Sequence, residues 1–108
     1  MPKRPAPILS TRADDPELRD EIDRFVIGLA ERIDGIQDSE LAGDADQLVT
    51  LTQSLADDAE RLGYPGMSQI ARQVVAAASD RKLERAQEAI FELTDCAQRI
   101  RRGHRGAA

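Results

Sequence analysis

The chain has 108 residues, of which 41% are hydrophobic and 3% aromatic, and its formal net charge is −5. This length allows one domain with a single core, and the scarcity of aromatic residues favours packed helices over a β-sheet, so we expect an all-α fold. The negative charge argues against nucleic acid as a partner, because a phosphate backbone would meet an unfavourable field except at the two short basic ends.

The sequence gives little indication of a membrane segment, a disulfide or a metal site. No apolar run approaches the roughly 20 residues that cross a bilayer, and the first residues lack the apolar region of a signal peptide. We therefore expect a cytoplasmic protein without membrane contact. Cys96 is the only cysteine, which rules out an intrachain disulfide and a cysteine-rich zinc site. Its helical spacing from Leu93 and Ile100 predicts a buried thiol, and no metal or other cofactor is expected.

The N-terminal part predicts an arm followed by a long helix. Residues 1–14 contain three prolines and no periodic pattern, which indicates a flexible arm in which Ile8 and Leu9 are the candidates to dock on the body. The first helix is predicted to begin after Asp15 as its N-cap and to end at Gly43. Its apolar residues recur in steps of three and four, at Leu18, Ile22, Phe25, Leu29, Ile33 and Ile36.

Two shorter helices follow on either side of a Gly-Tyr-Pro-Gly corner. The second is predicted to open with Asp44 and Gln47 as a capping box and to close with Gly63 as a left-handed cap. Its apolar stripe is Leu48, Leu51 or Thr52, Leu55, Ala59 and Leu62. The third is predicted to begin near Pro65 and to stop at residues 78–80. Its apolar stripe is Met67, Ile70, Ala71, Val74 and Ala78.

A fourth helix completes the predicted fold. It is expected to be capped by Ser79 or Asp80, and residues 103–108, rich in glycine and arginine, are expected to form a disordered tail. Its apolar stripe is Leu83, Ala86, Ile90, Leu93, Ala97 and Ile100. Four amphipathic helices with short connections predict an antiparallel up-down four-helix bundle over residues 15–102, with an extended N-terminal arm.

Few residues offer catalytic chemistry. His104 is the only histidine, and it lies in the predicted tail, where nothing would hold it in a defined geometry. Asp57 and Asp58 are adjacent on a predicted helix, so they point about 100° apart and cannot easily share one ligand. Asp57 and Glu60 form a negative patch that Arg61 is close enough to compensate. This acidic surface predicts either a solvated face or a face for docking a partner.

Five short segments of the chain carry a resemblance to a known family. They read ADDPEL at residues 13–18, FVIGLAERI at 25–33, LAGD at 41–44, LGY at 62–64 and CAQRIRR at 96–102. Through them the chain resembles the histidine-containing phosphotransfer (Hpt) domain, a four-helix bundle that relays phosphoryl groups between two-component signalling proteins. The segments fall in register without a gap from Pro16 to Tyr64, and the likeness extends to about Arg102.

The resemblance also implies where the site would lie. Family members carry a phosphorylatable histidine in the second helix, then a lysine and a glycine, and a further glycine that closes the helix. Aligning the closing glycine with Gly63 places Gln53 at the histidine position, Ala56 at the lysine position and Asp57 at the glycine position. A carboxamide nitrogen is not basic and cannot accept a phosphoryl group as imidazole does. No histidine lies within residues 1–103, so no other register restores one.

These observations lead to an expected function and to an alternative from another class. The first is a degenerate Hpt-like protein, not an enzyme, that binds a receiver or histidine-kinase domain. Its expected partner-binding face consists of Gln53, Ala56, Asp57 and Glu60. The alternative is a structural or oligomerising helical bundle unrelated to phosphorelay, in which the small residues 76–78 of the third helix form a homodimer contact. Active phosphotransfer remains a third hypothesis, which the absence of the histidine disfavours.

Overall fold

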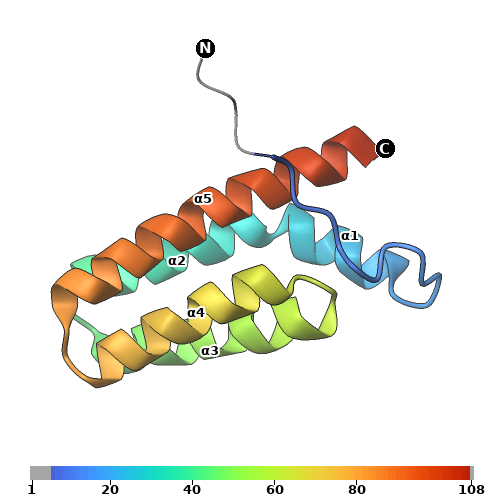
Figure 1. Ribbon diagram of the computed structural model, residues 1–108. Helices are drawn as coiled ribbons and strands as arrows, with labels where there is room; N and C mark the ends of the chain where they lie inside the picture. The colour runs from blue at the N-terminus through green and yellow to red at the C-terminus, as the bar shows by residue number, and fades with distance from the viewer. Residues whose placement is uncertain (1–5, 108) are drawn as a thin grey trace, which may run out of the picture.

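Helices make up the regular structure of the protein, as expected from the sequence (Figure 1). The computed structural model describes residues 6–107, and no strand occurs among them. The helices are α1 (Arg19–Ile27), α2 (Leu29–Leu41), α3 (Ala45–Arg61), α4 (Pro65–Ser79) and α5 (Leu83–Ala107). α3 packs against α2 and α4, α5 packs against α4 and α2, and α1 lies against α2 and α5, and each of these helices contributes buried residues to the core. The prediction of an all-α fold is confirmed.

The predicted first helix is divided in two at Gly28. α1 ends at Ile27 and α2 begins at Leu29, with Gly28 between them at a ψ of 0°. Glycine has a low helix propensity, which accounts for a break at this residue. The amide of Gly28 still donates to Arg24 O at 3.0 Å, so only one residue leaves the helix. The prediction of one continuous helix was wrong, but the predicted apolar stripe faces the core along both pieces.

The boundaries of α3 and the start of α4 follow the prediction. The side chain of Asp44 accepts a hydrogen bond of 3.0 Å from the amide of Gln47 and caps α3. Gly63 follows the end of α3 with a φ of 89°, in the left-handed region that glycine tolerates best. Pro65 is the first residue of α4, where its missing amide proton costs nothing. These local rules therefore define the corner between α3 and α4.

The starts of α1 and α5 differ from the prediction. Asp15 caps a short turn, and α1 begins only at Arg19. Asp80 is the C-cap of α4 and does not begin the next helix. The connection continues through Arg81 at a φ of 58°, and α5 begins at Leu83. Before α1 and before α5, the connecting turn therefore extends beyond the residue that the sequence predicts as the N-cap.

The predicted stripes supply most of the core. The largest fully buried side chains are Leu29, Ile36, Thr52, Leu55, Leu62, Met67, Val74, Leu93 and Ile100. Thr52, not Leu51, is the fully buried member of the pair that the periodicity left open. Leu83 is exposed because it stands at the first residue of α5, before the helix reaches the core.

Residues 6–12 form a strap that crosses the ends of the helices. The amide of Ile8 donates to Arg99 O at 3.1 Å, and the hydroxyl of Ser10 donates to Leu62 O at 2.6 Å. The amide of Thr11 donates to Gly63 O at 2.8 Å. The expected docking of Ile8 is confirmed, whereas Leu9 is exposed. The expected flexible arm, residues 1–14, is thus part of the fold from residue 6 onward, and residues 1–5 lie outside the described residues.

The strap also packs against the C-terminal part of α5. Residues 103–107 continue α5, so the prediction of a disordered tail over residues 103–108 is wrong for them, and residue 108 lies outside the described range. Gly103 is buried directly beneath the strap, and a Cβ at this position would collide with the carbonyl of Ile8. The contact between the strap and Gly103 explains why a glycine occupies this place in the helix.

Replacing Gly63 by alanine is expected to destabilise the protein more than the same change at Gly43. Both glycines have positive φ, which costs an L-residue about 1 to 2 kcal/mol. A Cβ at Gly63 would also lie 2.8 Å from the amide nitrogen of Arg12, whereas nothing lies within 4 Å at Gly43. Urea denaturation should show an additional loss of about 1 kcal/mol or more for Gly63→Ala. Equal losses would show that the strap does not pack on this corner.

Candidate functional site

Gln53 lies in the middle of α3, half-buried, at the position where the resemblance places a histidine. Its Nε2 donates to Asp57 Oδ1 at 3.2 Å, one turn further along the helix. An amide nitrogen has no lone pair available for attack, so Gln53 can donate and accept hydrogen bonds but cannot be phosphorylated as imidazole is. The site therefore offers recognition chemistry and no nucleophile at this position.

Ala56 does not belong to the exposed face, which corrects its assignment to the partner-binding surface. Its side chain is 0% exposed, like those of Leu55 and Ala59 on the same helix. The reason is helical spacing, because positions three and four apart share the face that α3 turns toward the core. A lysine at this position would have to bury its ammonium group, so the lysine of the Hpt pattern has no place in this structure.

Asp57 and Glu60 are exposed, and an arginine of the neighbouring helix joins them. Arg72 of α4 places Nη2 2.8 Å from Glu60 Oε2 and 3.6 Å from Asp57 Oδ1. The prediction that Arg61 compensates Asp57 is wrong, because Arg61 pairs with Asp58 and Glu21 instead. The cation beside Asp57 and Glu60 thus comes from across the α3–α4 corner.

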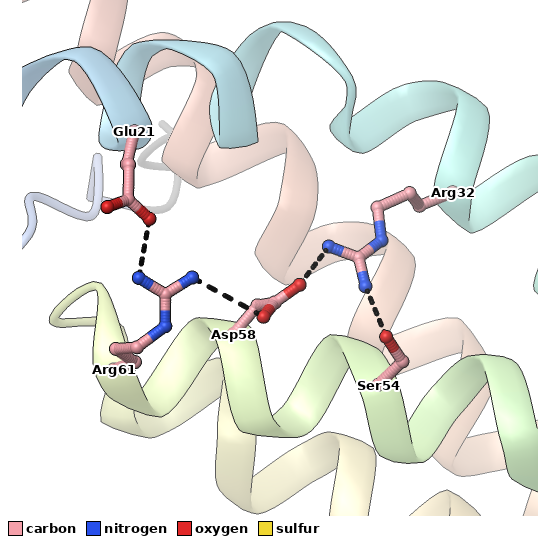
Figure 2. A network of polar contacts seen from close by, with 5 residues as sticks. All are labelled: Glu21, Arg32, Ser54, Asp58 and Arg61. Carbon is pink, nitrogen blue, oxygen red and sulfur yellow. Dashed lines mark hydrogen bonds and ion pairs between the residues drawn. The ribbon is translucent and has the colours of Figure 1, made fainter.

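A second polar network ties α3 to α1 and α2 (Figure 2). Arg61 donates to Glu21 of α1 at 2.5 Å and lies 3.6 Å from Asp58. Arg32 of α2 donates to Asp58 at 2.9 Å and to the hydroxyl of Ser54 at 3.2 Å. The hydrogen bond to Glu21 raises the pKa of Arg61 above its already high usual value, so this guanidinium stays charged. Asp58 is therefore held between two arginines.

Aromatic packing positions Arg32 for this network. Its guanidinium lies 5.8 Å from the centroid of the Phe25 ring, within the range of a cation–π interaction. Phe25 in turn stacks on Tyr64, with ring centroids 5.7 Å apart. Burial raises the pKa of Tyr64, so its hydroxyl stays protonated at neutral pH. This aromatic pair thus joins Tyr64 at the α3–α4 corner to Phe25, which lies shortly before the break at Gly28.

We call the accessible surface of α3 formed by Gln53, Asp57 and Glu60 the α3 strip. The strip and Asp58 beside it carry three carboxylates, each paired with an arginine. Because of these pairs, the surface is more nearly neutral than the negative patch that the sequence predicts. Asp57 and Glu60 pair with Arg72 and are nevertheless 64% and 67% exposed, so the strip is an accessible polar surface.

Sequence reasoning missed Arg32 and Arg72. Each of these arginines pairs with a carboxylate on a neighbouring helix, so an i, i+3 or i, i+4 spacing cannot predict the pairs. A usable signal existed for Arg72, because it and Asp57 lie at similar distances along the chain from the α3–α4 corner. Residues at similar distances from such a corner face each other across a helical hairpin.

His104 and Cys96 supply no nucleophile to the strip. His104 is part of α5, not of a free tail, and its Nε2 lies 3.2 Å from Asp23 Oδ1 of α1. Cys96 is buried as predicted, and burial raises the pKa of its thiol to about 11. The thiol is consequently protonated at neutral pH, and a protonated thiol is a poor nucleophile.

Within residues 6–107, no three side chains of His, Cys, Asp or Glu gather in a way that would hold a metal ion. The helices of this part of the chain also include none with the length and apolar content needed to cross a membrane. The sequence matches no family model, and no match was found among curated proteins or solved structures.

Proposed function

We propose that the protein is a non-catalytic, Hpt-like interaction module that binds a receiver or histidine-kinase domain of a two-component system through the α3 strip. The observation that carries this proposal is Gln53, a non-nucleophilic side chain at the centre of an accessible, polar helix face. In this proposal, α1 and α2 form one interrupted helix, which makes an antiparallel four-helix bundle with α3, α4 and α5. It places the protein in the cytoplasm with its partners.

The absence of phosphoryl transfer follows from the chemistry of the strip. Relay requires a nucleophile that attacks the phosphoryl group of a receiver and then releases it. Gln53 cannot do this, and no lysine can stand at buried Ala56 to offset the charge of the phosphate. Asp57 and Glu60 would bring two further carboxylates close to an incoming phosphoryl group.

Partner binding is supported by the order of the strip. Arg72 of α4 pairs with both carboxylates of the strip, and Arg32 of α2 and Arg61 of α3 pair with Asp58 beside it, so the positions of these charges depend on how the helices pack. Ion pairs at the surface add little stability by themselves, but preorganised polar groups lower the entropy lost on association. The α3 strip can therefore recognise a complementary polar surface without a large rearrangement.

Charge reversal on the strip is expected to weaken receiver binding. Asp57→Lys with Glu60→Lys would remove both partners of Arg72 and invert the local field, so we expect an affinity at least about tenfold lower. Glu84→Lys with Glu88→Lys, two exposed changes on α5, makes the matched control and should leave the affinity within about twofold. Isothermal titration calorimetry with receiver and kinase domains of the same cell measures both. Failure of all these domains to bind the parent protein would contradict the proposal.

Incubation with a phosphorylated receiver is expected to leave the protein without acid-labile phosphate. Gln53→His with Asp57→Gly is the version of the restored site that the structure permits, because Ala56→Lys would disrupt the core. Labelling of this double variant but not of the parent would support the placing of the histidine position at Gln53. Labelling of the parent protein would overturn the non-catalytic reading.

The alternative, an oligomerising bundle, loses the contact on which it rested. Ala77 and Ala78 of α4 are buried within the protein, and only Ala76 of this run is exposed. The small residues are thus used in packing α4 and are not available for a close contact with a second copy. Light scattering at high concentration checks this point, and we expect a monomer.

A further inference from the structure

The seam between α2 and α5 carries a groove that the proposed function does not use. The two helices lie side by side (Figure 1). The groove between them has a volume of about 520 Å³. Gln37 Nε2 donates to Thr94 Oγ1 at 3.0 Å across the seam, and buried Ile90 lies between the rims. Leu41 and Phe91 line the same groove and are 83% and 78% exposed. Exposed apolar side chains that gather on one groove are a feature of interaction surfaces.

The two charges that line this α2/α5 groove are both negative, and the smaller hollow that continues the seam adds Asp34 and Arg101. Glu40 and Asp95 line the groove, and no lysine or arginine does. The hollow on the other side of Phe91 adds Glu92, and its one cation, Arg99, is bonded to the backbone of the strap. No ion pair involves Glu40, Glu92 or Asp95 within residues 6–104, in contrast to the carboxylates of the α3 strip. The exposed apolar side chains are therefore bordered by carboxylates that lack a cationic partner there.

The sign of the charge decides between occupants. A second copy would bring the same carboxylates into a closed interface, where like charges repel. Nucleic acid and anionic lipid headgroups are disfavoured for the same reason. A helix with one apolar and one basic face matches both the exposed apolar side chains and the carboxylates beside them. Its apolar side chains at i and i+4 would enter the groove between the two helices, and its basic side chains would face the carboxylates.

We propose that the α2/α5 groove binds a basic amphipathic helix of a partner protein. Apolar side chains of that helix pack against Leu41 and Phe91, and its lysine or arginine side chains pair with Glu40 and Asp95. The groove shares no residue with the α3 strip, so this inference does not rest on the proposed function. The protein would then hold two partners, or two parts of one partner, on separate surfaces.

A synthetic helix of leucine and lysine, about 18 residues or five turns long, is the probe. Fluorescence anisotropy should show that it binds the parent protein and that a leucine–glutamate helix of the same pattern does not. Phe91→Ser, and separately Glu40→Gln with Asp95→Asn, should each weaken binding at least about tenfold. Ile27→Ser is the matched control for Phe91→Ser, because Ile27 is 77% exposed and does not line the groove. Glu31→Gln with Asp46→Asn is the matched control for the charge variant, because it also removes two exposed carboxylates and neither lines the groove. Both controls should stay within about twofold.

Three results would overturn the proposal. Equal binding of the basic helix to the parent protein and to every variant would show that its binding does not depend on the groove. Absence of binding to the parent protein would show that the groove does not accept such a helix. A homodimer of the parent protein that Phe91→Ser dissolves would show that the occupant is a second copy. Circular dichroism of each variant checks that these surface changes leave the fold intact.

Discussion

Ala56→Lys is expected to lower the free energy of unfolding by about 3 to 5 kcal/mol, the cost typical of an uncompensated charge in a protein interior. The side chain of Ala56 is fully buried between the helices, so a lysine must either bury its ammonium or push the helices apart. Urea denaturation followed by circular dichroism measures this loss.

Thr50→Lys is the control for this change. Thr50 is exposed on α3, where an exposed substitution should cost less than about 0.5 kcal/mol. A cost below about 1 kcal/mol for Ala56→Lys would mean that residue 56 is accessible, as a lysine position on an Hpt surface would be. The pair of variants thus tests directly how far the resemblance extends into the site.

Leu55→Ala is expected to cost about 2 to 5 kcal/mol, because it leaves a cavity at a fully buried position. Gln53→Ala, two residues away on the same helix, should cost under about 0.5 kcal/mol. It removes only a hydrogen bond of 3.2 Å to Asp57 on a solvent-accessible turn. The same denaturation experiment compares the two variants.

The two losses of stability together show which face of α3 is turned toward the core. If α3 lies as described, the large loss belongs to Leu55 and the small one to Gln53. A large loss of stability for Gln53→Ala with a small loss for Leu55→Ala would show that the α3 strip faces the core. In that case the strip would not be available to a partner.

Much of the fold could be predicted because the signals are local. Asp44, Gly63 and Pro65 act through capping and backbone conformation, which depend on neighbouring residues, and the structure confirms all three. The break at Gly28 was missed because a continuous apolar stripe outweighed one glycine in the sequence. The end of α5 was misjudged because the strap packs on Gly103 from a distant part of the chain.

The candidate site was predicted less well, since it depends on contacts between helices. Periodicity placed Asp57 and Glu60 on the surface, where they lie. It did not reveal that Arg72 would join them, so the strip was expected to be more negative than it is. Ala56 was assigned from alignment with the Hpt pattern and not from the stripe of α3, and its burial shows that the stripe was the better guide.

We propose that the α3 strip binds a receiver or kinase domain without accepting phosphate. Titration of the ¹⁵N-labelled protein with a receiver domain of the same cell tests it most directly, because each backbone amide reports on its own surroundings. We expect the largest chemical-shift changes at Gln53, Asp57 and Glu60, of equal size with phosphorylated and unphosphorylated receiver. No change at saturating concentrations of any receiver or kinase domain of the same cell, or changes confined to the α2/α5 groove, would contradict this proposal.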